Sequence, residues 1–317
     1  MKNLVVRNIV FAFLCVALLF MIGKGFDMLS RRNFYSHVWS DIYDSRINAD
    51  MVFLGSSRTH VGISPRILDS VLGIKTYNLG LEGWDFSMQY VRFKILISHN
   101  RMPKYIVQNI DFTTFEKRND LFTREQFLPF LDDSILYNGC KGFEGEFTWK
   151  DKYLPMYKYM NHADVLIMSL TGFLKNHKQA KQDAAKGSEL VDERWTSSFS
   201  DFQKKYPDGI HRTIDSAVLQ NFEKYIRLCK KDNISLIFDF APIYYEELPM
   251  EKDSAILMNV YRRLSAEYGI PILDYRQDTL CFNTKYFYNS QHLNKTGAEI
   301  FSRHLGEDLK KLISVPN

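Results

Sequence analysis

Short apolar runs that alternate with helical patterns constrain the fold of this chain more than any other feature. The runs are rich in β-branched and aromatic residues, and most stretches between them carry apolar residues at three-to-four spacing. Helices that connect successive strands make the strands parallel, and a parallel sheet is covered by helices on both faces. The sequence therefore predicts a three-layer α/β fold, with strands at 51–54, 75–78, 104–110, 235–240 and 271–274.

The alternation breaks off after the third predicted strand and resumes near Thr213. The stretch between, at about 113–212, contains aromatic-rich and helical pieces and a polar, lysine-rich segment at 175–187 that is typical of a loop. We therefore expect one α/β domain at 49–317, with a helical insertion that forms a cap over the site. Residues 25–48 form a charged and aromatic connector in front of this domain.

The beginning of the chain is apolar. Ile9–Gly23 contains no charged residue, and Leu4–Val6 extend the apolar character towards the N-terminus. About twenty apolar residues span a bilayer, so this segment is near the minimum length for a transmembrane helix. The bulky and charged residues at 21–26 offer no small-residue cleavage site. We expect an uncleaved anchor at 1–24 that contacts the membrane through 9–23; a cleaved signal peptide is the alternative.

The charges around the apolar segment bear on its orientation. Lys2 and Arg7 precede it, which favours an N-terminus in the cytoplasm and a domain outside it. Lys24, Arg31 and Arg32 follow the segment and weaken this preference. The resulting expectation is a single-pass protein of the cell membrane with its α/β domain extracytoplasmic.

Charge and cysteine spacing bear on several classes of ligand. The net charge is +4, but no basic tract could track a phosphate backbone, which argues against nucleic-acid binding. Cys15 lies in the apolar segment, and Cys140, Cys229 and Cys281 lack the spacing of a metal site. The sequence therefore predicts unpaired thiols and neither a metal nor a cofactor.

Polar and small residues gather where the predicted strands end. Gly55–Arg58 reads GSSR and follows the first strand, Gly80 and Gly83 follow the second, and Asn109 and Asp111 close the third. The carboxyl ends of parallel strands meet at one edge of a sheet, and ligands of such folds bind beyond that edge. We therefore expect these residues to surround one crevice.

A serine and a histidine from opposite ends of the chain can meet in this crevice. Ser57 follows the first strand, and His292 stands just ahead of the last predicted helix. Acyl chemistry of the Ser–His type needs a nucleophile and a base that are distant in sequence and adjacent in space. The competing interpretations are a helix N-cap for Ser57 and a surface position for His292. Arg58 is expected to be solvated.

Three motifs in this order resemble the SGNH, or GDSL-like, esterases and acyltransferases. They are GSSR at 55–58, NLGLEG at 78–83 and HLNKTGA at 292–298, and the resemblance covers roughly 50–112 and 213–313. More closely, the chain resembles the membrane-anchored bacterial members related to the D-alanyl-lipoteichoic acid protein and the alginate O-acetylation proteins. This resemblance implies a flavodoxin-like sheet and ester chemistry.

The resemblance also implies roles for residues of the first three strand ends. Ser57 matches the nucleophile, and Ser56 stands where the family usually has an aspartate. The backbone N–H groups of Ser57 and Gly83, together with the side chain of Asn109, would form the oxyanion hole. The third strand lacks the family's usual glycine, so its register leaves Asp111 as the alternative to Asn109.

His292 matches the catalytic histidine of the family, but Asn289 stands where an aspartate usually precedes it. Asparagine can orient an imidazole, yet it cannot stabilise an imidazolium by charge. An active Ser–His pair, or a Ser–His–Asn arrangement, is the interpretation that we favour. Asp274 or Asp278 could instead supply the carboxylate, or the site could be weak or inactive.

The expected activity is hydrolysis or transfer of an acyl ester of a cell-surface glycan through an acyl-Ser57 intermediate. The anchored relatives imply this substrate class by analogy. They also make a membrane-bound acyl-donor protein a candidate partner. The alternative is a catalytically inactive glycan-binding or scaffold protein of a polysaccharide modification system, and Asn289 is the residue that keeps this alternative open.

Overall fold

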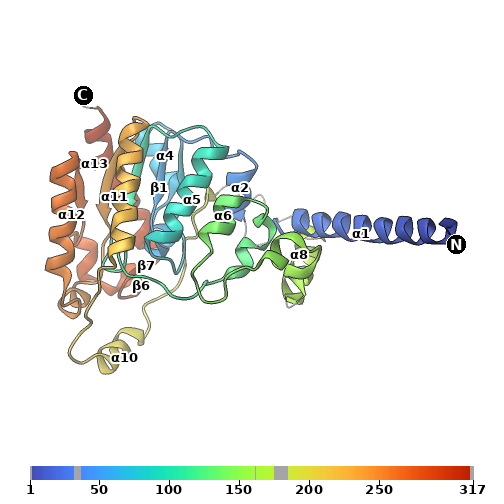
Figure 1. Cartoon of the computed structure of the whole chain (residues 1–317). Helices are drawn as coiled ribbons and strands as arrows, with labels where there is room; N and C mark the ends of the chain where they lie inside the picture. Colours follow the sequence, from blue (N-terminus) through green and yellow to red (C-terminus); the bar gives the residue numbers. More distant parts are fainter. Residues whose placement is uncertain (1, 32–36, 161, 175–184, 315–317) are drawn as a thin grey trace. The chain divides into compact units, whose positions relative to one another are not determined.

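The structure is a computed structural model that describes residues 2–31, 37–160, 162–174 and 185–314. The chain divides into two units, whose elements are labelled in Figure 1. The helical unit comprises Met1–Asp44 and Asn119–Lys181, and the α/β unit comprises Ser45–Arg118 and Gln182–Asn317.

The α/β unit contains a five-stranded sheet in the order β2-β1-β3-β4-β5, in which all neighbouring strands are parallel. This order is that of flavodoxin-like sheets. The predicted fold class is therefore confirmed, and each predicted strand is present within two residues of its predicted ends. The strands are β1 Met51–Leu54, β2 Thr76–Asn78, β3 Tyr105–Asn109, β4 Ser235–Phe240 and β5 Ile272–Asp274.

Helices cover the sheet in two layers (Figure 1). The first layer comprises α3 Ser57–Gly62, α4 Pro65–Leu72 and α13 Lys295–Ser314, and α13 contacts both of the others. The second layer comprises α5 Phe86–His99, α11 Ser216–Lys231 and α12 Ser254–Tyr268. Phe222 of α11 joins this second layer, since its ring lies 4.6 Å from Phe86 of α5 and 6.4 Å from Tyr261 of α12.

Capping residues set the ends of the helices beside the first two strands. Ser64 occupies the N-cap of α4 with Pro65 at its first turn, and Gly73 ends the helix in the left-handed conformation at φ 71°. Asp85 caps α5 by accepting a hydrogen bond from the backbone N–H of Ser87 at 2.8 Å. These residues fix the two ends of α4 and the start of α5.

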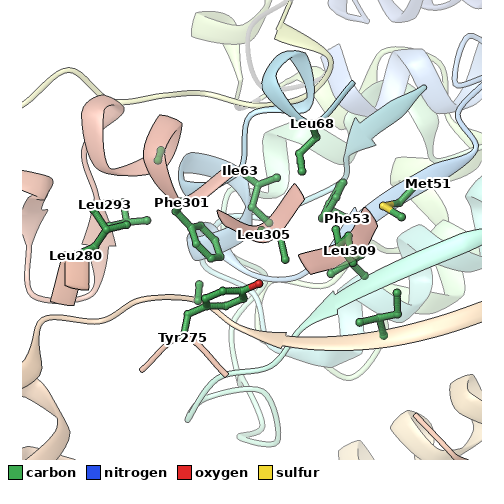
Figure 2. Packing of buried hydrophobic residues seen from close by; sticks show 14 of the residues in the cluster. Met51, Phe53, Ile63, Leu68, Tyr275, Leu280, Leu293, Phe301, Leu305 and Leu309 are labelled. Atoms are coloured by element: carbon green, nitrogen blue, oxygen red, sulfur yellow. The ribbon is translucent and has the colours of Figure 1, made fainter. Parts of the chain in front are cut away.

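The core between the sheet and α13 is built from alternate residues of the strands and one stripe of the helix. Met51 and Phe53 of β1 point to this face, opposite Phe301, Leu305 and Leu309 of α13 (Figure 2). All five side chains are fully buried. The three-to-four spacing predicted for the last helix therefore holds up to Leu309.

The C-terminal part of the α/β unit also contains short elements that the strand and helix patterns did not predict. A small antiparallel hairpin precedes α13 and pairs Asn289 with His292. Its strands are β6 Phe287–Asn289 and β7 His292–Leu293. The neighbouring elements are α10 Ser198–Lys205, η4 Tyr245–Met250, η5 Thr279–Phe282 and η6 Thr284–Tyr286.

The helical unit begins with α1, Lys2–Ser30, which is long and apolar enough to span a membrane over Asn3–Ser30. The expected apolar segment 9–23 lies inside this helix. The predicted connector 25–48 is therefore partly helical, and its residues 32–36 lie outside the described part of the chain. The other elements of the unit are α2 His37–Tyr43, η2 Arg124–Phe130, α6 Ser134–Gly139, α7 Trp149–Tyr153, η3 Tyr157–Tyr159 and α8 Ala163–Leu174.

The limits of the units differ from the predicted limits of the insertion at 113–212. Residues 182–212 belong to the α/β unit, and the backbone N–H of Asn78 bonds to the carbonyl of Lys186 at 3.0 Å. The predicted loop at 175–187 lies outside the described residues for 175–184. At its described end, Gly187 adopts φ 82° beside the carbonyl of Asn78, a position that a side chain could not share.

Candidate active site

Ser57 is the first residue of α3, directly beyond the carboxyl end of β1. The turn that leads to it is tight, because a Cβ added at Gly55 would lie only 2.7 Å from the Cβ of Asn109 and closer still to Thr59. Only glycine fits this turn. The N-cap of α3 is Ser56, so the hydroxyl of Ser57 is not used as a cap.

The structure brings Ser57 and His292 together across 235 positions of the chain. Ser57 Oγ lies 2.8 Å from His292 Nε2, which is hydrogen-bond distance. His292 Nδ1 in turn lies 2.9 Å from Asn289 Oδ1. A serine hydroxyl, an imidazole and an amide oxygen thus form a continuous chain of contacts, which is the arrangement that a Ser–His mechanism requires.

The partners of Asn289 determine which tautomer of His292 fits. Asn289 Oδ1 also accepts the backbone N–H groups of Gln291 at 3.0 Å and His292 at 2.9 Å. Because donors converge on this oxygen, His292 carries its proton on Nδ1 and donates it to Asn289. The lone pair of Nε2 is then free to accept the proton of Ser57.

The surroundings of His292 favour its neutral form. Burial and the nearby positive charge of Arg58 lower the pKa of His292 to about 4, although Asp111 acts in the opposite direction. The ring of Tyr288 stacks on the imidazole at 5.4 Å between centroids. At neutral pH the imidazole is therefore unprotonated and held in place, as a general base must be.

Neither of the carboxylates considered as substitutes for Asn289 contacts His292. Asp274 binds the guanidinium of Arg276, with Oδ1 2.8 Å from Nε. Asp278 binds His304 Nδ1 at 2.7 Å and caps η5. Within the described part of the chain, the group on Nδ1 of His292 is the Asn289 amide.

Ser56 is engaged elsewhere, although it is adjacent to Ser57 in sequence. Its hydroxyl donates to Asp111 Oδ2 at 2.8 Å. The other oxygen of Asp111 accepts the backbone N–H and the hydroxyl of Thr113, both at 2.8 Å, and the hydroxyl of Thr114 at 3.1 Å. Ser56 therefore helps to fix the loop after β3.

Two of the predicted oxyanion groups lie at the candidate site. The backbone N–H of Ser57 is in the first turn of α3, where it has no acceptor within the helix. Gly83 lines the same cavity and adopts φ 71°. Arg118 fixes this glycine, because Arg118 Nη1 donates to the Gly83 carbonyl at 2.8 Å. The backbone N–H of Arg118 also donates to Asp85 Oδ2 at 2.8 Å.

The prediction for Asn109 is corrected by the structure. Asn109 is almost fully buried within the sheet, where β3 pairs it with Asp239 of β4. Its side-chain amide donates to Asp239 Oδ2 at 3.0 Å and does not reach the cavity that Ser57 lines. Asp111, the alternative, does line the cavity, but its carboxylate has no N–H to offer an oxyanion.

Arg58 is buried instead of solvated, which the sequence did not indicate. Its Nη2 donates to the carbonyls of Ala241 at 2.5 Å and Pro242 at 3.2 Å, and its guanidinium lies 4.9 Å from the ring centroid of Phe240. Burial lowers the pKa of Arg58, while Asp111 and other acidic groups oppose this effect. The residue therefore places a fixed positive charge beside His292.

These residues surround a cavity of about 290 Å³. One wall carries an ion pair that sequence reasoning missed: Arg212 binds Glu251 through Nε at 2.7 Å and Nη2 at 2.6 Å. No spacing in the sequence links these two residues, so only the fold reveals the pair. The lining residues are Ser56, Ser57, Arg58, Gly83, Trp84, Asp85, Asp111, Phe112, Thr113, Glu116, Lys117, Arg118, Arg212, Ile243, Glu251, Gln291 and His292.

No protein-family model and no curated protein matches the chain. Among solved structures, the chain is similar to a protein described as a G-D-S-L-family lipolytic protein from Desulfitobacterium hafniense, at 11% identity and a TM-score of 0.39. The match covers 81% of this chain and 97% of that one.

Two further solved structures show a likeness of the same size. An acetyl xylan esterase is 13% identical with a TM-score of 0.40, and the match covers 84% of this chain and 99% of that one. A protein from Bacteroides fragilis described as an acylhydrolase is 14% identical with a TM-score of 0.36, covering 82% and 87%. The solved structures to which this chain is similar thus include the G-D-S-L group that its sequence motifs resemble.

Proposed function

We propose that this protein is an SGNH-type ester hydrolase or O-acyltransferase with Ser57 as nucleophile and His292 as base. The observation that carries the proposal is the contact of 2.8 Å between Ser57 Oγ and His292 Nε2, continued by the contact of 2.9 Å to Asn289 Oδ1. The pair lines a cavity at the carboxyl edge of a parallel sheet, where ligands of such folds bind.

The proposed reaction has two halves. Ser57 Oγ attacks the ester carbonyl and passes its proton to His292 Nε2, while the N–H groups of Ser57 and Gly83 face the developing oxyanion. His292 then gives this proton to the departing alcohol, which leaves an acyl group on Ser57. Water, or a sugar hydroxyl, loses its proton to His292 as it attacks the acyl-serine, and the proton returns to Ser57 Oγ.

Asn289 orients His292 without stabilising its charged form. A neutral amide can hold the tautomer, but it adds no charge to stabilise the imidazolium that forms during the attack. The positive charge of Arg58 works against that imidazolium as well. We therefore expect a slower first half-reaction than a Ser–His–Asp triad would support.

The proposed location is the cell membrane, with α1 as an uncleaved anchor and the α/β unit on the extracytoplasmic side. Lys2 and Arg7 ahead of the apolar run support this orientation. The proposed substrate is an acyl ester of a cell-surface glycan, and a membrane-bound acyl-donor protein is the proposed partner for transfer. The resemblance of the motifs to anchored acyltransferases supports both.

A catalytically inactive glycan-binding protein is the second candidate. It is favoured by one observation, which concerns two residues of the site. The family usually has an aspartate where this chain has Asn289, and an asparagine where this chain has Asp111. Both candidates use the same cavity, so a reaction at Ser57 distinguishes them.

The test is covalent labelling of the full chain by a fluorophosphonate probe, together with hydrolysis of a short-chain aryl ester. We expect wild-type protein and Ser56→Ala to be labelled and to turn over the ester, and Ser57→Ala to do neither. Ser56 is the matched control, because it is the adjacent serine and its hydroxyl is bound to Asp111. Absence of both labelling and turnover in the wild-type protein would favour the inactive glycan-binding candidate.

A further inference from the structure

A short segment of the helical unit exposes an unusual number of large hydrophobic side chains. Trp149, Tyr153, Leu154, Tyr157 and Met160 are exposed to 57%, 60%, 41%, 37% and 73%. The helix α7, which contributes the first two, buries none of its residues. Large hydrophobic side chains that are exposed this close together in a chain are typical of a surface that meets a partner or a membrane.

The C-terminal part of this segment contacts the end of α1. A Cβ at Gly23 would lie 3.6 Å from the backbone nitrogen of Met156, and Tyr159 donates its hydroxyl proton to Asp27 Oδ1 at 2.7 Å. Gly23 is the last residue of the charge-free run. Residues 156–159 therefore lie beside α1 at the level where the apolar part of the helix ends, and α7 precedes them directly in the chain.

A buried ion pair fixes this placement. Lys158 Nζ lies 2.7 Å from Asp27 Oδ1, and both side chains are only 9% exposed. Separating them would leave a charge buried without a partner, which is strongly unfavourable. The segment is therefore held against α1, and the position of α1 in the bilayer determines the depth of the segment.

We propose that Trp149, Tyr153, Leu154, Tyr157 and Met160 form an interfacial surface that contacts the lipid bilayer beside α1. Tryptophan and tyrosine are enriched at the level of the headgroups, where their rings are buried and their polar atoms stay hydrated. This inference rests on the proposed anchoring of the chain by α1.

Two lysines support a lipid partner over a protein partner. Lys152 Nζ lies 5.7 Å from the ring centroid of Tyr153, and Lys150 Nζ lies 5.9 Å from that of Tyr157. Lysine stems can lie along an apolar surface while the ammonium groups reach lipid phosphates. Basic residues beside interfacial aromatic rings suit an anionic membrane.

The tryptophans of the chain allow a direct test. The chain has four, Trp39, Trp84, Trp149 and Trp195, and none lies in α1. Trp39 and Trp84 are buried, and Trp195 is half-buried. Bromine on lipid acyl chains quenches tryptophan fluorescence only at short range, so it reports contact with the hydrocarbon.

The full chain is reconstituted into vesicles of phosphatidylcholine and phosphatidylglycerol, with or without bromine on the acyl chains. We expect bromine to quench Trp149 alone, which would lower the tryptophan emission of the wild-type protein by up to about one quarter. The Trp149→Phe variant should lose this response, and the Trp195→Phe variant should keep it. Trp149 is exposed, so its replacement by phenylalanine does not endanger folding.

Flotation of the same vesicles tests the anchoring by α1 separately from the interfacial surface. Protein that floats with the vesicles, but whose emission bromine does not change, would overturn the interfacial surface and leave the anchor intact. An equal response in wild-type protein and Trp149→Phe would overturn it too, because the quenched tryptophan would lie elsewhere. Protein that does not float would overturn the anchor and this inference together.

Discussion

At the scale of single residues, the site is defined by what surrounds one imidazole. Asn289 Oδ1 accepts a hydrogen bond from the imidazole of His292 and two more from backbone N–H groups. The backbone therefore helps to hold the Asn289 side chain in place. Arg58 adds a positive charge from the other side. This combination makes the neutral base available over a wide pH range and makes its protonation costly.

The first prediction follows from this balance. Wild-type kcat/KM should fall only as pH drops through about 4, because that is the pKa of His292, and its neutral form is the base. In Asn289→Asp a carboxylate beside Nδ1 stabilises the imidazolium and raises the pKa. The acid limb of the pH profile should therefore move to higher pH, and the plateau should rise or hold.

The controls for this prediction are the two aspartates that the structure places elsewhere. Asp274→Asn and Asp278→Asn should keep kcat/KM within about two-fold of wild type, a change of ~0.4 kcal/mol. His292→Ala should remove activity in every background. A large loss in either aspartate variant, or an unmoved acid limb in Asn289→Asp, would contradict the assignment of Asn289 as the orienting group.

Sequence reasoning anticipated that Ser57 and His292 would lie together but did not anticipate where Asn109 lies, and the reason is physical. Ser57, Gly83 and His292 follow strand ends or precede a helix, which are positions that local patterns mark. Asn109 and Asp111 are two residues apart at the end of one strand. Which of them faces the cavity depends on where β3 stops pairing, and no local pattern gives this register.

At the scale of elements, two buried or half-buried arginines hold the loop between β2 and α5. Arg92 donates to the carbonyls of Leu79 at 3.3 Å and Gly80 at 2.9 Å, and Arg118 donates to that of Gly83 at 2.8 Å. Carbonyls tied in this way orient the N–H groups of the same peptide chain. The sequence could not show this, because both guanidinium groups reach the loop from elements that follow it.

The second prediction tests Arg118. Its replacement by alanine should lower kcat about ten-fold, or ~1.4 kcal/mol of transition-state stabilisation, with little change in KM, because the oxyanion forms only in the transition state. Arg118→Lys should recover part of the loss. Arg101→Ala, which removes an exposed partner of Asp50, is the matched control and should leave both constants unchanged. A rise in KM alone would assign Arg118 to substrate binding.

The third prediction concerns α13 and its packing on the sheet. Leu305 is fully buried and Leu312 is 38% exposed on the same helix. Leu305→Ala should lower the free energy of unfolding by about 2–5 kcal/mol, since the cavity adds to the lost burial, and Leu312→Ala by well under 1 kcal/mol. Denaturant melts of the full chain in detergent measure both. Equal losses would mean that α13 packs through a different face.

The elements themselves were largely predictable, and the short ones were not. Short apolar runs such as Met51–Leu54 marked the strands, because both faces of a parallel sheet are buried. The hairpin β6–β7 has strands of three and two residues, too short for any periodicity to show. The extent of the insertion was misjudged for a similar reason, since 186–191 joins the α/β unit through single backbone hydrogen bonds.

At the scale of the whole molecule, one buried carboxyl group makes the stability of the fold depend on pH. Asp239 lies in β4 and is fully buried beside Asn109. Burial raises the pKa of Asp239 to about 7, although Asn109 and Arg58 act in the opposite direction. In an unfolded chain the same group titrates near about 3.9.

The fourth prediction follows by linkage. Between about pH 4 and pH 7 the folded chain keeps a proton on Asp239 that the unfolded chain has released, so the contribution of Asp239 to stability falls as pH rises through this window. Asp239→Asn should lose this dependence, so the difference in Tm, wild type minus variant, should decrease from pH 4.5 to pH 7. The exposed Asp201→Asn should melt like wild type at each pH. A constant difference across the window would contradict the raised pKa.

The contact between Asp27 and Lys158 has a consequence for proteolytic shedding. Many anchored proteins are released by one cut between the anchor and the domain that it carries. Here α1 is also held by a distant part of the same unit, through this ion pair and the hydroxyl of Tyr159. In the proposed anchored protein, a single cut between α1 and α2 would therefore leave the rest of the chain attached to α1, and release would require this contact to open as well.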